Sequence, residues 1–203
     1  MQDSTGNVVD VGPRVPRVHN RFLYWLGRSI LRAWGWRIHM RLPDEPRLIV
    51  IAAPHTSNWD FVFGIAAILA SGLRFNWYAK HTLFTGPWGG FFRAIGGVPV
   101  DRSAPGGVVV QTADLFARSE QLMIALAPEG TRSRVTRWKR GFHHIALAAR
   151  IPVAVGYIDY DRKQVGIEFL FRPTGDWEAD MQPVFEFYRH IRAKRPQDFS
   201  VET

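Results

Sequence analysis

The chain has 203 residues, a formal net charge of +8 and a hydrophobic content of 46%. This length suits a single domain with a substantial core, and this hydrophobic content excludes disorder over most of the chain. Cysteine is absent, which excludes disulfides, thiolate metal sites and thiol nucleophiles, and the seven histidines lack the spacing of a zinc site. We therefore expect no metal.

The N-terminal end of the chain is polar and basic. Residues 1–16 contain glycine and proline and predict a flexible arm. Asp3 and Asp10 interrupt any apolar core there, which argues against a signal peptide. Residues 1–41 contain seven arginines, two aspartates and no lysine. Such a basic cluster suits nucleic acid or an anionic membrane surface, and charge alone does not separate the two.

Residues 17–41 predict an amphipathic helix region that lies in a membrane interface. On a helical wheel the arginines form one stripe, the apolar side chains form a separate arc, and tryptophans lie beside both. The side chains expected to meet the membrane are Arg21, Trp25, Arg28, Arg32 and Trp34. Arginines interrupt every apolar window, whereas a transmembrane span needs about 20 apolar residues. An amphipathic helix packed on the protein's own core is the alternative.

An apolar run at residues 48–53 predicts a buried parallel strand, because β-branched residues dominate and no polar residue alternates with them. The apolar segment at residues 61–70 predicts a helix, with Thr56, Ser57 or Asn58 available as its N-cap. The segment between them therefore lies at the carboxyl end of a strand, where open α/β sheets bind their ligands.

This loop contains His55, and Asp60 follows five residues later. If Asp60 occupies the first helical turn, its carboxylate can reach back to the imidazole, orient the ring and stabilise its protonated form. The pair would then act as a general base on an alcohol. A loop histidine beside a helix-capping acid is the alternative for this segment alone.

The rest of the chain alternates between strand and helix patterns. We expect strands at residues 75–79, 97–100, 121–127 and from 151 onward, with an edge strand at 165–171. We expect helices at residues 108–117, 142–150 and 184–193. The alternation predicts an α/β fold with a mostly parallel central sheet flanked by helices, without a linker or repeat that divides it.

A second polar segment follows the strand expected at residues 121–127. It runs Glu129-Gly130-Thr131-Arg132-Ser133 after a proline. The glycine and the hydroxyl residues let the backbone approach a ligand, and Arg132 carries a planar guanidinium that suits phosphate. A common surface turn is the alternative for this segment taken alone.

Four blocks in the chain resemble the glycerolipid acyltransferase family, whose bacterial members include 1-acyl-glycerol-3-phosphate acyltransferases. The blocks lie at residues 55–60, 97–102, 128–133 and 151–156, in the order of the family. Pro54 stands where an asparagine often precedes the histidine, and Ala127 replaces an aromatic residue. Neither departure touches the His, Asp, Glu or Arg positions. The resemblance implies an acyltransferase domain over residues 42–203.

The resemblance also implies a reaction. His55 would deprotonate a lipid hydroxyl, which attacks the thioester of acyl-CoA or acyl-carrier protein without any further cofactor or covalent enzyme intermediate. The expected substrate-binding residues are Arg102, Glu129, Gly130, Thr131 and Arg132. Arg102, Arg132 and the backbone at Gly130 would hold the acceptor's phosphate, and Glu129 would orient Arg132 or accept a hydrogen bond from an acceptor hydroxyl. The acceptor expected first is 1-acyl-glycerol-3-phosphate, in phospholipid biosynthesis; an aminolipid or glycolipid is the alternative.

These expectations place the protein on the cytoplasmic side of a membrane, as a peripheral or monotopic protein on an anionic surface. Two other classes of function were weighed. A hydrolase could use the same pair to activate water, but the chain lacks a Gly-x-Ser-x-Gly elbow. A basic nucleic-acid-binding domain would explain the charge, but the basic residues form no nucleic-acid motif, so we expect no nucleic-acid partner.

Overall fold

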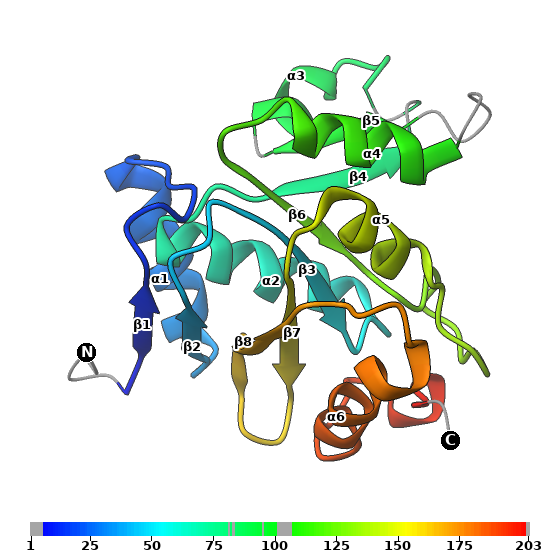
Figure 1. Ribbon diagram of the computed structural model, residues 1–203. Coiled ribbons are helices and arrows are strands. Elements are labelled where there is room, and N and C mark those ends of the chain that lie inside the picture. Colours follow the sequence, from blue (N-terminus) through cyan, green and yellow to red (C-terminus); the bar gives the residue numbers. More distant parts are fainter. Residues whose placement is uncertain (1–5, 81, 83, 95, 101–106, 202–203) are drawn as a thin grey trace.

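The computed structural model of the protein describes residues 6–80, 82, 84–94, 96–100 and 107–201 (Figure 1). Its centre is an eight-stranded sheet in the order β1-β2-β8-β7-β3-β6-β4-β5. Neighbouring strands are parallel except β7 and β8, which are antiparallel. The strands are β1 (Val8–Val11), β2 (Arg37–Leu42), β3 (Arg47–Ala53), β4 (Asn76–Lys80), β5 (Gly97–Val100), β6 (Leu122–Leu126), β7 (Val153–Asp159) and β8 (Gln164–Phe171).

Helices cover both faces of the sheet (Figure 1). The helices are α1 (Arg21–Ala33), α2 (Asn58–Ser71), α3 (Gly89–Ala94), α4 (Gly107–Ala117), α5 (Gly141–Ala149) and α6 (Trp177–Arg189). Successive residues of a strand point to opposite faces, so Ile49 and Ile51 of β3 pack with α4, α5 and α6, while Leu48 and Val50 pack with α1 and α2. The predicted α/β fold is confirmed.

The strand and helix that flank His55 form where the sequence predicts them. β3 lies between β6 and β7, and its buried positions explain why no polar residue alternates along it. Ser57 caps α2 in a capping box with Asp60, and Gly72 ends the helix in a left-handed conformation with φ of 67°. Local signals at both helix ends therefore position the loop between β3 and α2.

The N-terminal part differs from the expectation. Residues 8–11 are not a flexible arm, because they form β1 against β2, and Val15 is buried in the core at 1% exposure. The helix in the region expected at 17–41 is Arg21–Ala33, and β2 begins at Arg37 within the same region. The burial alternates along β2, since Ile38, Met40 and Leu42 face the core. The sequence analysis did not predict this strand.

Two C-terminal elements also differ. β8 is not an edge strand, because β2 pairs with its outer side and β7 with its inner side. α6 begins at Trp177, before the expected start after Pro183, because Asp176 caps it by accepting a hydrogen bond from the Ala179 N–H at 3.1 Å. Burial of Trp177 and Met181 holds this first part of the helix in place despite the internal proline.

α1 packs closely on α2 at Gly27. A Cβ atom at this position would lie 2.5 Å from the carbonyl oxygen of Ala66 and 2.6 Å from the amide nitrogen of Ala70. Gly27 and Leu31 are buried, so α1 belongs to the fold through this side. In the described part of the chain, no helix has the length and hydrophobicity to cross a bilayer.

We predict that Gly27→Ala destabilises the protein. Alanine favours a helix over glycine by about 1 kcal/mol, so a net loss would come from the clash with the α2 backbone. Overpacking of this kind costs about 1–3 kcal/mol and should lower the midpoint of thermal unfolding by several degrees. Ser29→Ala, at an exposed position of the same helix, is the control and should not lower it. A Gly27→Ala protein as stable as the wild type would contradict the close packing.

Candidate active site

The loop between β3 and α2 is organised by the carboxylate of Asp60. The side chain is buried at 2% exposure. Its Oδ2 atom accepts hydrogen bonds from the backbone N–H groups of Thr56 and Ser57 at 2.6 and 2.7 Å. Its Oδ1 atom accepts one from the hydroxyl of Tyr160 at 2.6 Å. These donors compensate the burial of a charge and fix the backbone next to His55.

Asp60 acts on His55 through space in this structure. Among the described residues no hydrogen bond joins the imidazole of His55 to Asp60, so the expected direct contact is not formed here, and the capping role offered as the alternative is present. Burial is the main influence on His55 and lowers its pKa, the negative charge of Asp60 raises it, and the positive charge of Arg132 lowers it further. A lowered pKa keeps the imidazole neutral near pH 7, which is the form that accepts a proton.

Glu129 supports the same loop from the other side. It follows β6, and its Oε1 atom accepts a hydrogen bond from the backbone N–H of His55 at 2.9 Å, across 74 positions of sequence. The side chain is buried at 2% exposure, and Oε2 has no hydrogen-bond partner among the described residues. The two roles expected for Glu129 were contacts with Arg132 or with an acceptor; the contact formed here is with His55.

The environment of Glu129 makes it a weak acid. Its pKa is raised from an ordinary value of 4.5 to about 7, mainly by burial. The hydrogen bond from the His55 N–H lowers this pKa, and the charge of Asp60 raises it further. The two buried carboxyl groups also differ in their hydrogen bonds, since Asp60 accepts three and Glu129 accepts one.

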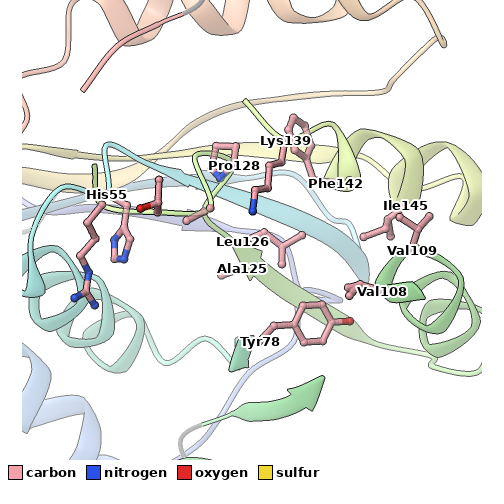
Figure 2. Close-up of a pocket in the computed structure, with 15 residues that line it drawn as sticks. His55, Tyr78, Val108, Val109, Ala125, Leu126, Pro128, Lys139, Phe142 and Ile145 are labelled. Carbon is pink, nitrogen blue, oxygen red and sulfur yellow. The ribbon is translucent and has the colours of Figure 1, made fainter. Parts of the chain in front are cut away.

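A pocket of about 600 Å³ opens beside His55 (Figure 2). Figure 2 shows His55 at one end of the pocket, Val108, Val109 and Ile145 at the other, and Lys139 between them. Thr131 and Arg132 also line the pocket, and the charge of Arg132 acts on His55. Apolar side chains from α4, α5 and β6 line the rest, namely Val108, Val109, Leu126, Phe142 and Ile145. The volume is typical of small-molecule sites, and the change from polar to apolar lining fits a ligand with a polar reacting group and an apolar tail.

Two details shape this pocket. Gly130 has φ of 68°, and a Cβ atom there would lie 2.5 Å from Cε of Lys139, so the lysine side chain crosses the glycine. At the apolar end the hydroxyl groups of Tyr78 and Thr112 are 2.7 Å apart and hydrogen-bonded. The pocket is therefore bounded by the ammonium of Lys139 at one place and by Tyr78, whose hydroxyl is paired with that of Thr112, at another.

The structure brings together most residues that the sequence singles out. His55, Gly130, Thr131 and Arg132 line the pocket, while Asp60 and Glu129 support the His55 loop from behind. Arg102 lies outside the described residues. The residues expected at a membrane, Arg21, Trp25, Arg28, Arg32 and Trp34, do not line this pocket. They lie on or directly after α1, where Arg28 hydrogen-bonds Tyr24 and Trp34 contacts Trp59 with ring centroids 6.0 Å apart.

Sequence analysis missed several functional positions. The apolar lining of the pocket comes from α4 and α5, whose residues were recognised only as helix formers. Tyr160 follows β7 and lies 100 positions after Asp60, with no local pattern to connect them. In the described ranges no group of three His, Asp or Glu side chains could hold a metal ion.

The raised pKa of Glu129 predicts a pH-dependent stability. Between about pH 4.5 and 7 the folded protein retains a proton that the unfolded chain has lost, so Glu129 lowers stability progressively as the pH rises through this window. Glu129→Gln removes this titration and keeps a carbonyl oxygen for the His55 N–H. The free energy of unfolding of wild type relative to Glu129→Gln should fall between pH 4.5 and 8 by an amount on the order of 3 kcal/mol. Urea denaturation of both proteins measures it, and a difference independent of pH would contradict the assignment.

The chain is similar to known proteins in sequence and in fold. A family model described as Acyltransferase matches residues 37–158. No curated protein matches the chain. The crystal structure of the 1-acyl-sn-glycerophosphate (LPA) acyltransferase PlsC from Thermotoga maritima is similar, with a TM-score of 0.57 and 20% sequence identity over 82% of this chain and 75% of that one, which shows a shared fold. Because the family model matches more than half of its length, this chain belongs to the acyltransferase family.

Proposed function

We propose that this acyltransferase moves a fatty acyl group from acyl-CoA or acyl-carrier protein to a hydroxyl of a lysophospholipid, with 1-acyl-glycerol-3-phosphate as the first acceptor to test. The observation that carries the proposal is the placement of His55, under the influence of the Arg132 charge, at one end of a pocket whose other end is apolar. A phosphate headgroup suits the cations, and an acyl chain suits the apolar lining. Such an enzyme would serve phospholipid biosynthesis.

The proposed reaction uses His55 as a general base. The imidazole takes the proton of the acceptor hydroxyl while its oxygen attacks the thioester carbonyl, and Asp60 stabilises the imidazolium that forms. The tetrahedral intermediate then expels the donor's sulfur, which leaves as a thiol after it receives the proton from His55. No covalent acyl-enzyme is needed, since the acceptor oxygen attacks the donor directly.

Cationic groups near His55 support a phosphate in the acceptor. Arg132 has a planar guanidinium for paired hydrogen bonds to phosphate oxygens. Lys139, whose side chain crosses Gly130, adds a second positive charge. Ionised Glu129 would repel phosphate, but its contact with the His55 N–H keeps it behind the loop. Arg132 and Lys139 are therefore the proposed acceptor ligands among the described residues, and Arg102 stays a candidate on the sequence alone.

We expect His55→Ala to lower the rate of acyl transfer by at least about 10²-fold, because general-base catalysis contributes about 10²–10⁴-fold. Release of free thiol from acyl-CoA or acyl-carrier protein in the presence of lysophosphatidate measures the rate. The variant should keep its thermal midpoint, since Asp60 and Glu129 bind the backbone of the loop and not the ring of His55. A folded His55→Ala protein with more than a tenth of wild-type activity would exclude this mechanism.

The outer side of α1 supports attachment to a membrane. Phe22, Trp25 and Leu26 are exposed at 74%, 59% and 40%, although α1 packs on α2 through Gly27. Exposed apolar side chains continue onto the first turns of α2, which follow the His55 loop: Trp59, Phe61 and Val62. An exposed apolar surface beside arginines fits a helix in the interface of an anionic membrane, where an amphiphilic acceptor resides. We place this attachment on the cytoplasmic side, where acyl donors are made.

We predict that the double substitution Phe22→Asp and Leu26→Asp releases the protein from phosphatidylglycerol vesicles at any salt concentration, because both side chains are exposed and contribute apolar area. Replacing Arg21, Arg28 and Arg32 by glutamine should weaken binding and reduce its sensitivity to salt, at about 1 kcal/mol per basic residue close to the surface. Vesicle sedimentation measures both. Val110→Asp, exposed on α4 on the other side of the sheet, is the control and should bind like wild type. Failure of the wild type to bind at low salt would refute the membrane role.

A further inference from the structure

Tyr160 donates one of the three hydrogen bonds that the carboxylate of Asp60 accepts from described residues. A carboxylate oxygen accepts about two hydrogen bonds. Oδ2 already accepts from the N–H groups of Thr56 and Ser57, whereas Oδ1 accepts only from the hydroxyl of Tyr160, at 2.6 Å. The acceptor position of Asp60 that is still open is therefore on Oδ1. The hydrogen bond from the Tyr160 hydroxyl to the same atom fixes the orientation of the carboxylate.

Tyr160 is held rigidly enough for this purpose. Its ring contacts Trp36 edge-on with centroids 4.9 Å apart, and Phe63 at 6.2 Å. Its backbone N–H donates to the carbonyl of Arg192 at 2.9 Å, and the ammonium of Lys194 lies 5.3 Å from the ring centroid. Burial, the hydrogen bond to Asp60 and the charge of Asp60 all raise the pKa of Tyr160, so its hydroxyl remains a donor at physiological pH.

Tyr160 is also separate from the substrate pocket. It does not appear among the side chains that line that pocket, so its effect on the reaction passes through Asp60. It lies beyond residues 37–158, the part of the chain that the acyltransferase family model covers. The segment that packs against it, around Arg192 and Lys194, lies beyond that part as well. The family match therefore does not assign this contact.

We infer that Tyr160 is a positioning residue of the catalytic pair: its hydroxyl fixes the orientation of the Asp60 carboxylate and, by sharing the negative charge, sets how strongly Asp60 stabilises the imidazolium of His55. The inference rests on the proposed roles of His55 and Asp60. Loss of the hydroxyl has two consequences. Asp60 is oriented less well, which slows proton transfer. Its charge is also less shared, which increases its attraction for the imidazolium and raises the pKa of His55.

The test is Tyr160→Phe, which removes only the hydroxyl. We expect kcat to fall by about tenfold, the size of one oriented hydrogen bond to a charged group, with both KM values within twofold of wild type. The acid limb of the kcat–pH profile should move upward by about half a pH unit or more. Tyr157→Phe is the matched control, since Tyr157 lies on β7, the strand that Tyr160 follows, and its hydroxyl donates to Gln164 at 2.9 Å and does not contact Asp60. This control should leave the rate and the profile unchanged.

Two further measurements keep the test independent of stability. Site-specific replacement of Tyr160 by 3-fluorotyrosine preserves the ring and makes the hydroxyl a stronger donor, so the acid limb should move downward, opposite to Tyr160→Phe. In an Asp60→Asn background, Tyr160→Phe should lower kcat by much less than in wild type, because the two side chains act as one unit. An unchanged acid limb in both Tyr160 proteins, or an effect confined to KM, would overturn the inference. Activity in His55→Ala would instead refute the proposed function itself.

Discussion

Two buried carboxyl groups hold the backbone of the loop that carries His55, and the rest of the candidate active site depends on them. Asp60 binds the N–H groups of Thr56 and Ser57, and Glu129 binds the N–H of His55. A buried carboxylate without such donors would be unstable, and the loop without these acceptors would leave buried N–H groups unpaired. The carboxyl groups and the loop N–H groups therefore satisfy each other's hydrogen-bonding needs. As a result, the loop that connects β3 to α2 becomes a rigid support for the His55 ring.

This support divides the polar groups of the site between two tasks. Asp60 and Glu129 lie behind the loop, whereas Arg132 and Lys139 lie in the pocket with His55. The acids therefore support the loop from outside the pocket, and the two cations remain available for the phosphate of the proposed acceptor. Partial burial of His55 lowers its pKa and keeps the ring neutral near pH 7, as a proton acceptor requires.

α1 illustrates how one helix can belong to the core and still present an apolar outer surface. Gly27 and Leu31 form the inner side, where the missing Cβ of Gly27 allows the backbones of α1 and α2 to approach. Phe22, Trp25 and Leu26 form the outer side. The two alternatives weighed from the sequence, a core helix and an interfacial helix, are thus compatible, because they concern different sides of the same helix.

The sequence by itself determined the α/β class, the strand and helix around His55, and the two segments that contain His55, Asp60, Glu129 and Arg132, because these features rest on local hydrophobic patterns, capping residues and short motifs. Tertiary structure alone decided the strand order, the role of β1 and β2, the apolar pocket lining, and the contacts of Glu129 with His55 and of Tyr160 with Asp60. Those contacts join residues 74 and 100 positions apart. No local sequence pattern connects the two residues of either contact. Only the packing of the strands and helices against one another brings them within hydrogen-bonding distance.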